Sequence, residues 1–153
     1  MKLGLIGLGR MGNGIAARLR NAGHEVVGFD ANPAVSEVPT LEALVQSLEA
    51  PRIVWVMVPS GAPTQQTLDT LSGLLSSGDI VVEGGNSNYH DSVRRAQKLA
   101  SKGITMLDCG VSGGIWGLQN GFCLMAGGPR GAFETVEPLL KALGAEKGYA
   151  YVG

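Results

Sequence analysis

The chain has 153 residues, a length that suits one domain with a sizeable core. Its 12 basic and 13 acidic residues are interspersed and sum to a net charge of −1, which excludes a basic surface for nucleic acid or for an acidic membrane. Its longest apolar runs have the length of strands and are too short to span a bilayer. We therefore expect a cytoplasmic protein whose partners include neither nucleic acid nor membrane.

Strand and helix patterns alternate along the whole chain. An apolar run at residues 3–6 leads into a glycine-rich turn, and a helical pattern follows to about residue 21. Further strands are expected at residues 25–30, 52–58, 79–83, 104–108, 121–126 and 148–152. Further helices are expected at residues 41–48 after Thr40 as N-cap, 63–75, 90–102 and 132–143. This alternation predicts a Rossmann-type α/β fold, a doubly wound and mainly parallel sheet with helices on both faces, formed by residues 1–153 as one domain.

The turn after the first strand carries the motif Gly7-Leu-Gly9-Arg-Met-Gly12. In a dinucleotide-binding turn the first glycine permits the tight bend, the second admits the pyrophosphate, and the third lets the helix pack on the strand. The free N–H groups and positive end of that helix would face the phosphates. Glycine-rich turns are common, but the strand before this one and the helix after it favour a dinucleotide site.

Asp30 ends the second expected strand, about 20 residues beyond the glycines, where this fingerprint places an acidic residue. Its carboxylate would accept hydrogen bonds from both hydroxyls of an adenosine ribose and would repel a 2′-phosphate. The next residues, Ala31, Asn32 and Pro33, supply no cation for such a phosphate. The sequence therefore favours NAD over NADP. The alternative is that Asp30 only caps a helix after Pro33.

Three loops after expected strands carry small or amide-bearing residues. They are Val58-Pro59-Ser60-Gly61, Gly84-Gly85-Asn86-Ser87 and Val111-Ser112-Gly113-Gly114. Ligands of an open parallel sheet bind outside the carboxyl ends of its strands. Such residues also dominate ordinary turns, but three such loops on the face expected for the nicotinamide favour a functional role.

Candidates for acid–base, nucleophilic or metal chemistry are weak in this chain. The lysines on or beside expected outer helices are interpreted as solvated charges: Lys98, Lys102, Lys141 and Lys147. His24 and His90 are isolated. We expect no catalytic residue and no metal ligand within these 153 residues.

Three further residue types can be placed from the pattern. Cys109 and Cys123 lack metal-ligand spacing, and both are expected to be buried, reduced thiols. Arg94 and Arg95 diverge by about 100° on a helix and cannot face one phosphate together. Trp55 is expected in the core, whereas Trp116, in a glycine-rich loop, fits a ligand contact and a packing role equally well.

Longer segments of the chain resemble 6-phosphogluconate dehydrogenase. They are the segments at residues 82–89 (VEGGNSNY), 107–117 (LDCGVSGGIWG) and 120–125 (NGFCLM). The resemblance covers essentially the whole chain and matches the amino-terminal, cofactor-binding domain of that family. The S-G-G segment is shared by the wider β-hydroxyacid dehydrogenases, whereas G-G-N-S is more selective. Asp30, the W-G pair and the absence of a lysine from the loop at residues 58–60 resemble the NAD-preferring, decarboxylating branch.

The resemblance implies oxidation of 6-phosphogluconate by NAD and decarboxylation to ribulose 5-phosphate, a step of the pentose phosphate pathway. It implies cofactor contacts from Gly7, Leu8, Gly9, Arg10, Met11, Gly12, Asp30, Ala31, Asn32, Val58, Pro59, Ser60 and Asn86. It implies substrate contacts from Asn86, Ser112, Gly113 and Gly114. The general-base lysine and the phosphate clamp would lie in an all-helical C-terminal domain that is absent from this chain and forms the dimer of the full-length homo-oligomer.

The chain alone is then expected to bind NAD without turnover, either as a monomer or associating through the surface where the second domain would dock. Two alternatives stay open. Another β-hydroxyacid dehydrogenase, acting on 3-hydroxyisobutyrate or a semialdehyde, conflicts with Gly84-Gly85-Asn86 and Trp116-Gly117. A non-catalytic NAD-sensing module fits the lack of a base, but it would have no use for Asn86 and Ser112 on the nicotinamide face.

Overall fold

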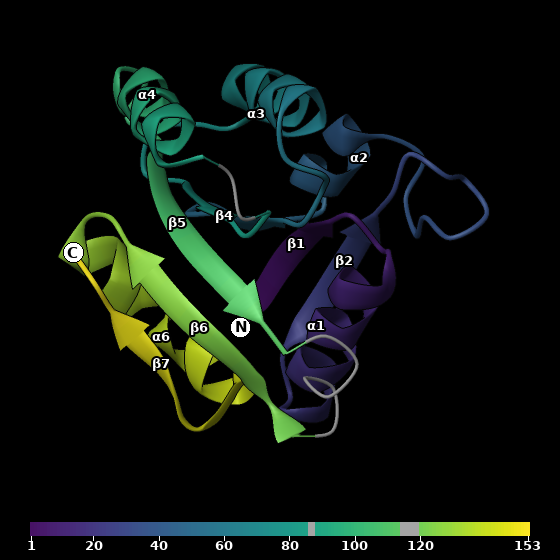
Figure 1. Cartoon of the computed structure of the whole chain (residues 1–153). Coiled ribbons are helices and arrows are strands. Elements are labelled where there is room, and N and C mark those ends of the chain that lie inside the picture. The colour runs from purple at the N-terminus through teal and green to yellow at the C-terminus, as the bar shows by residue number, and fades with distance from the viewer. Residues whose placement is uncertain (86–87, 114–119) are drawn as a thin grey trace.

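The strand patterns of the sequence come together in one sheet with helices on both of its faces (Figure 1). The structure, a computed structural model, describes residues 1–85, 88–113 and 120–153. Its elements are β1 (Lys2–Ile6), α1 (Arg10–Asn21), β2 (Glu25–Phe29), α2 (Leu41–Gln46), β3 (Ile53–Val56), α3 (Ala62–Leu74), β4 (Ile80–Glu83), α4 (Tyr89–Ala100), β5 (Thr105–Ser112), β6 (Phe122–Gly127), α6 (Arg130–Leu143) and β7 (Gly144–Tyr151). The expected order of strands and helices is confirmed.

The sheet has the strand order β2-β1-β3-β4-β5-β6-β7. The pairs from β2 to β5 are parallel, and so is β6 with β7, whereas β5 and β6 run antiparallel. A parallel crossover needs a dozen or more residues, and the connection between Ser112 and Phe122 is shorter than that. The sheet is therefore mainly parallel, as predicted, with one reversal near its β7 edge.

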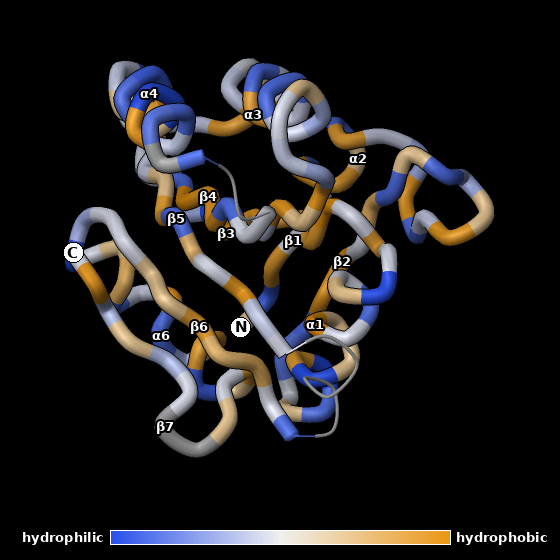
Figure 2. The backbone as a smooth tube through the Cα atoms, in the orientation of Figure 1, coloured by the Kyte–Doolittle hydropathy of each residue, from blue (hydrophilic) through white to orange (hydrophobic). Residues whose placement is uncertain are grey.

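The two faces of the sheet carry separate apolar cores, because successive side chains of a strand point to opposite faces. On β3, Ile53 and Trp55 belong to the core under α1 and α6, whereas Val54 and Val56 belong to the core under α2, α3 and α4. Figure 2 shows the apolar segments concentrated on β1, β3 and β4, between the two helix layers. Trp55 is fully buried, which confirms its predicted place in the core.

The predicted element boundaries hold in part. Thr40 caps α2 as predicted, its side chain accepting a hydrogen bond of 3.0 Å from the Ala43 amide. β5 continues through Gly110 to Ser112, a segment predicted as loop, because these residues pair with β6. β7 begins at Gly144, earlier than predicted.

The prediction that both cysteines are buried is wrong for Cys123. Cys109 is buried and Cys123 is exposed. β6 alternates buried and exposed residues, and Cys123 and Met125 lie on its exposed face. Alternation of this kind is typical of a strand with only one covered face.

In the described part of the chain, no helix is long and apolar enough to cross a membrane.

Candidate cofactor site

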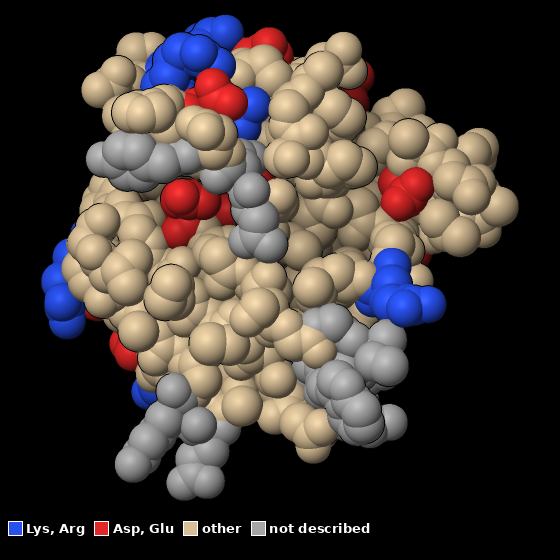
Figure 3. Space-filling model, viewed as in Figure 1, with Lys and Arg blue, Asp and Glu red and all other residues tan. Residues whose placement is uncertain are grey.

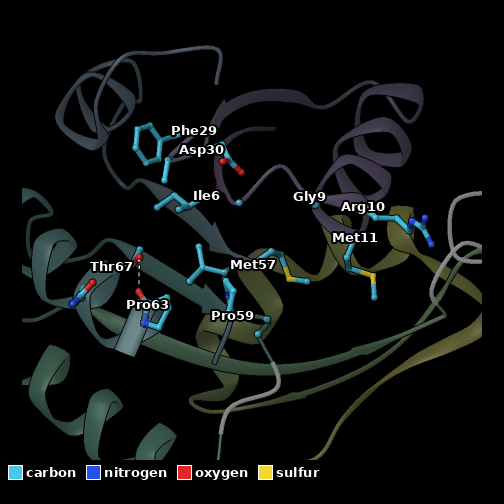
Figure 4. A pocket seen from close by; sticks show the side chains of 17 residues that line it. Ile6, Gly9, Arg10, Met11, Phe29, Asp30, Met57, Pro59, Pro63 and Thr67 are labelled. Carbon is cyan, nitrogen blue, oxygen red and sulfur yellow. Dashed lines mark hydrogen bonds between the residues drawn. The ribbon is translucent and has the colours of Figure 1, made fainter. Parts of the chain in front are cut away.

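A cavity of about 620 Å³ lies at the carboxyl ends of β1, β2, β3 and β4, beside the start of α1 (Figure 4). It includes the point between β1 and β3 where the strand order reverses, the usual ligand position in doubly wound sheets. Its described lining consists of Ile6, Gly7, Gly9, Arg10, Met11, Gly12, Phe29, Asp30, Ala31, Met57, Val58, Pro59, Pro63, Gln66, Thr67, Gly84 and Gly85. The volume is within the usual range for a small-molecule site.

The three motif glycines meet different steric demands. Gly7 has φ +99°, and a Cβ there would lie 2.4 Å from the Met57 carbonyl oxygen at the end of β3. A Cβ on Gly12 would lie 1.9 Å from the Gly7 carbonyl oxygen. A Cβ on Gly9 would meet none of the described atoms within 4 Å. Gly7 and Gly12 are therefore required by the turn itself, whereas Gly9 leaves open space beside the backbone for a ligand.

The beginning of α1 is open to an anion. Among the described residues, no side chain caps this end of the helix and no acidic residue lies in its first turn. The first α-helical bond runs from the Asn13 amide to the Gly9 carbonyl at 2.8 Å, so the amides before Asn13 have no acceptor within the helix. Gly9 and Met11 line the cavity at this end, and the Arg10 side chain extends away from its centre (Figure 4). Free amides and the positive helix end together suit a pyrophosphate.

Asp30 connects the two strands that frame the cavity. Its Oδ2 accepts a hydrogen bond of 2.7 Å from the Leu8 amide, and its Oδ1 accepts one of 2.8 Å from the Asn32 amide. The alternative that Asp30 only caps a helix after Pro33 is wrong, because the next helix is α2 and its N-cap is Thr40. A carboxylate has about four lone-pair positions, so two amide donors leave room for ribose hydroxyls.

The charged neighbours of this loop are paired with each other. Arg20 Nη2 donates to Glu37 Oε2 at 2.8 Å and to Oε1 at 2.9 Å, and also to the Val26 carbonyl at 2.9 Å. Glu37 Oε1 in turn accepts from the Gly28 amide at 2.8 Å. The Arg20 Nη2 group is thus already engaged by Glu37 and by the Val26 carbonyl.

One wall of the cavity is formed by residues that the sequence analysis did not predict. Pro63, Gln66 and Thr67 of α3 line it, and Figure 4 shows Pro63 and Thr67 at the opposite end from Met11. The Thr67 hydroxyl donates to the Pro63 carbonyl at 2.8 Å. The sequence does indicate that a helix begins directly after the third strand, at the end of the sheet where ligands bind. Which residues of that helix face the cavity is decided only by the packing of α3 on the sheet.

The structure brings most of the predicted cofactor residues together but not all of them. Leu8 is buried in the core and presents its amide to Asp30, while Asn32 and Ser60 are exposed and do not line the cavity. Ser112 and Gly113 are exposed at the end of β5. Asn86, Gly114 and Trp116 lie outside the described residues.

Ionisable groups at this site are few. In the described lining they are Arg10 and Asp30, and no lysine or histidine belongs to it. Nearby, Glu83 is fully buried and its Oε1 accepts from the Gly85 amide at 2.7 Å, while burial raises the pKa of the Asp108 carboxyl above its usual value. No group of three His, Cys, Asp or Glu side chains suited to a metal ion occurs in the described part of the chain. The described lining therefore offers one carboxylate and one guanidinium as its charged groups.

Comparison with known families matches residues 2–153 to the family described as the NAD binding domain of 6-phosphogluconate dehydrogenase. An NAD(+)-dependent, decarboxylating 6-phosphogluconate dehydrogenase of Haloferax volcanii is 40% identical over 163 residues, which cover 100% of this chain and 54% of that protein. The chain spans about half the length of two of the curated relatives that it matches.

Solved structures show the same fold. The 6-phosphogluconate dehydrogenase of Plasmodium falciparum, described with its cofactor NADP+ and with its substrate 6-phosphogluconate, gives a TM-score of 0.91 at 27% identity, over 100% of this chain and 37% of that one. The 3-hydroxyisobutyrate dehydrogenase of Mycobacterium tuberculosis gives a TM-score of 0.87 at 24% identity, over 98% of this chain and 53% of that one. The second likeness establishes a shared fold.

Proposed function

Because the chain belongs to the family of NAD binding domains of 6-phosphogluconate dehydrogenase, we propose that it forms the cofactor half of an enzyme that oxidises and decarboxylates 6-phosphogluconate with NAD. The observation that carries the proposal is the cavity at the carboxyl ends of β1 to β4, with Gly9, the open end of α1 and Asp30 along one side. NAD, when bound, accepts the hydride, and the residues of this chain bind and orient it.

The preference for NAD rests on Asp30 and its surroundings. A 2′-phosphate beside Asp30 would meet a carboxylate, and the Arg20 guanidinium is already bound to Glu37. Like charges in close contact disfavour binding, whereas ribose hydroxyls would donate to the carboxylate. The Haloferax relative is NAD(+)-dependent by name, in agreement with this choice.

Fluorescence titration with NADH and with NADPH tests the cofactor proposal. We expect the chain to bind NADH at least about tenfold more tightly than NADPH. We expect Asp30→Asn to weaken NADH binding by roughly 10- to 100-fold, because it removes hydrogen bonds to a charged group. Glu134→Gln is the matched control, because Glu134 is an exposed carboxylate on α6 that pairs with Arg130. Tighter binding of NADPH by the unmodified chain would contradict the proposal.

The substrate and a second domain belong to the same proposal. Ser112 ends β5 and Gly113 follows it; both are exposed, and we propose that they bind 6-phosphogluconate together with Asn86 and Gly114. We place the general base, the phosphate clamp and the dimer interface in a helical C-terminal domain, since two of the curated relatives are about twice as long as this chain.

A groove beside β5 and β6 supports that placement. Its volume is about 500 Å³, and the exposed apolar side chains Val93, Met125 and Val152 line it together with Asp108. Figure 3 shows acidic side chains gathered in a hollow of this side of the molecule. Exposed apolar side chains that share one groove are typical of an interaction surface, and we propose that the second domain covers this one.

A further inference from the structure

Two adjacent arginines of α4 lie in opposite environments. Arg94 has a side chain that is 68% exposed, and its guanidinium binds Asp91 of the same helix at 3.0 Å. Arg95 is only 4% exposed and points toward α3, which lies beside α4 on the same face of the sheet (Figure 1). Burial of a guanidinium is unfavourable unless strong partners compensate for the water that it loses. Arg95 therefore needs an explanation that Arg94 does not.

The acceptors of Arg95 are neutral. Its Nε donates to Gln65 Oε1 at 2.8 Å, and its Nη2 donates to the Gly61 carbonyl at 3.3 Å. Among the described residues its Nη1 has no hydrogen-bond partner. A carboxylate would be a stronger partner for a buried cation. The hydrogen bonds of Arg95 therefore go to Gly61 and Gln65, while its charge acts on the Asp69 carboxyl without a hydrogen bond, as one of the lesser causes that lower the pKa of that group.

Gly61 and Gln65 are the parts of the loop and helix that carry the cavity wall. Gly61 precedes α3 with φ +89°, and its carbonyl also accepts the first α-helical bond of α3, from the Gln65 amide at 3.0 Å. The buried Thr64 hydroxyl donates to the Pro59 carbonyl at 2.8 Å. On the other side of the same turn, Pro63, Gln66 and Thr67 face the cavity. Arg95 does not line the cavity; it contacts the loop and the helix that form this wall, through Gly61 and Gln65.

We propose that Arg95 is a positioning residue for the cofactor cavity: from α4 it fixes the loop at residues 58–61 and the first turn of α3, so that the wall opposite Met11 is formed before the cofactor arrives. This inference rests on the proposed function. A planar guanidinium can reach both acceptors at once, whereas the single ammonium group of a lysine cannot replace this fork. A preformed wall raises affinity because less ordering is needed on binding.

The test compares Arg95→Lys and Arg95→Met with Arg94→Met, at a temperature where circular dichroism shows every variant folded. We expect NADH and ADP-ribose each to bind roughly tenfold more weakly to the Arg95 variants, and unchanged to Arg94→Met. Hydrogen exchange supplies a second measurement: in Arg95→Lys, amides at residues 61–67 exchange faster, while those of β1 and α1 do not.

Several results would overturn the inference. Folded Arg95 variants that bind NADH as tightly as the unmodified chain would show that Arg95 does not position the cavity wall. Faster exchange spread over all elements would show a general structural role. Failure of both Arg95 variants to fold would do the same. If the unmodified chain binds neither NADH nor ADP-ribose, the proposed function fails. If it binds both and the Arg95 variants match it, only this inference fails.

Discussion

At the scale of single residues, the two cysteines show how strongly one strand face differs from the next. Cys109 is buried in the core under α1 and α6, and Cys123 lies on the exposed face of β6. Burial, followed by the nearby Asp108 and Glu83 carboxylates, raises the pKa of the Cys109 thiol to about 12. The thiolate is the reactive form of cysteine, so Cys109 should be inert in the folded chain.

We expect one fast-reacting thiol per folded chain when a disulfide reagent is added at about pH 8, and two in concentrated guanidinium chloride. With a pKa of about 12, only about one Cys109 thiol in ten thousand is ionised at that pH. The raised pKa also means that stability falls as pH rises from about 9 toward 12, because the unfolded chain loses this proton first. Cys123→Ser should remove the fast reaction, and a fast reaction that persists in this variant would contradict the burial of Cys109.

At the scale of elements, the turn between β1 and α1 separates what the fold requires from what the ligand requires. Gly12 packs its Cα against the Gly7 carbonyl, so the turn and the helix can approach each other only without a side chain there. Gly9 has φ −69°, an ordinary value, and its open side faces the cavity. One motif therefore contains a structural glycine and a ligand-facing glycine.

Alanine substitutions at these two glycines should have opposite effects. Gly12→Ala is expected to lower the free energy of unfolding by at least about 2 kcal/mol, because its methyl group overlaps backbone that cannot move freely. Gly9→Ala should change that free energy by less than about 1 kcal/mol, yet weaken NADH at least about tenfold, because its methyl group occupies the approach of the pyrophosphate. Urea denaturation and NADH titration of both variants check this, and equal losses of stability would show that the assignment is wrong.

At the scale of the whole molecule, the sheet places the cavity at the carboxyl ends of β1 to β4. The described lining contains Arg10 and Asp30 as its ionisable residues. Lys98 of α4 pairs with Asp69 of α3 and does not line the cavity. Oxidation of an alcohol requires a group that accepts the hydroxyl proton. The described lining contains no lysine or histidine, and its carboxylate, Asp30, already accepts hydrogen bonds from the Leu8 and Asn32 amides.

The purified 153-residue chain, supplied with NAD and 6-phosphogluconate, is therefore expected to bind cofactor but to produce no NADH above the rate of a blank. NADH formation can be followed by its absorbance, with a full-length relative as positive control. Gly9→Ala identifies the source of any signal. NADH formation that increases with the amount of chain and disappears in Gly9→Ala would show that this chain contains its own base.

Much of the fold and part of the cofactor site follow from the sequence. The alternation of apolar runs with 3.6-residue periodicity determined the order of strands and helices, and the spacing of Gly7, Gly9, Gly12 and Asp30 located the cofactor end of β1 and β2. The periodicities lie within single elements, and the glycines and Asp30 lie within one β1-α1-β2 segment, so both can be recognised without the fold.

Only the tertiary structure decided the rest. The antiparallel β6, the exposure of Cys123, the α3 wall of the cavity and the buried Arg95 at Gly61 depend on which elements become neighbours. Arg95 and Gly61 are separated by 34 residues, and nothing near either residue in the chain reveals the other. Sequence periodicity determines which face of an element is apolar, but the packing of distant elements determines what that face meets.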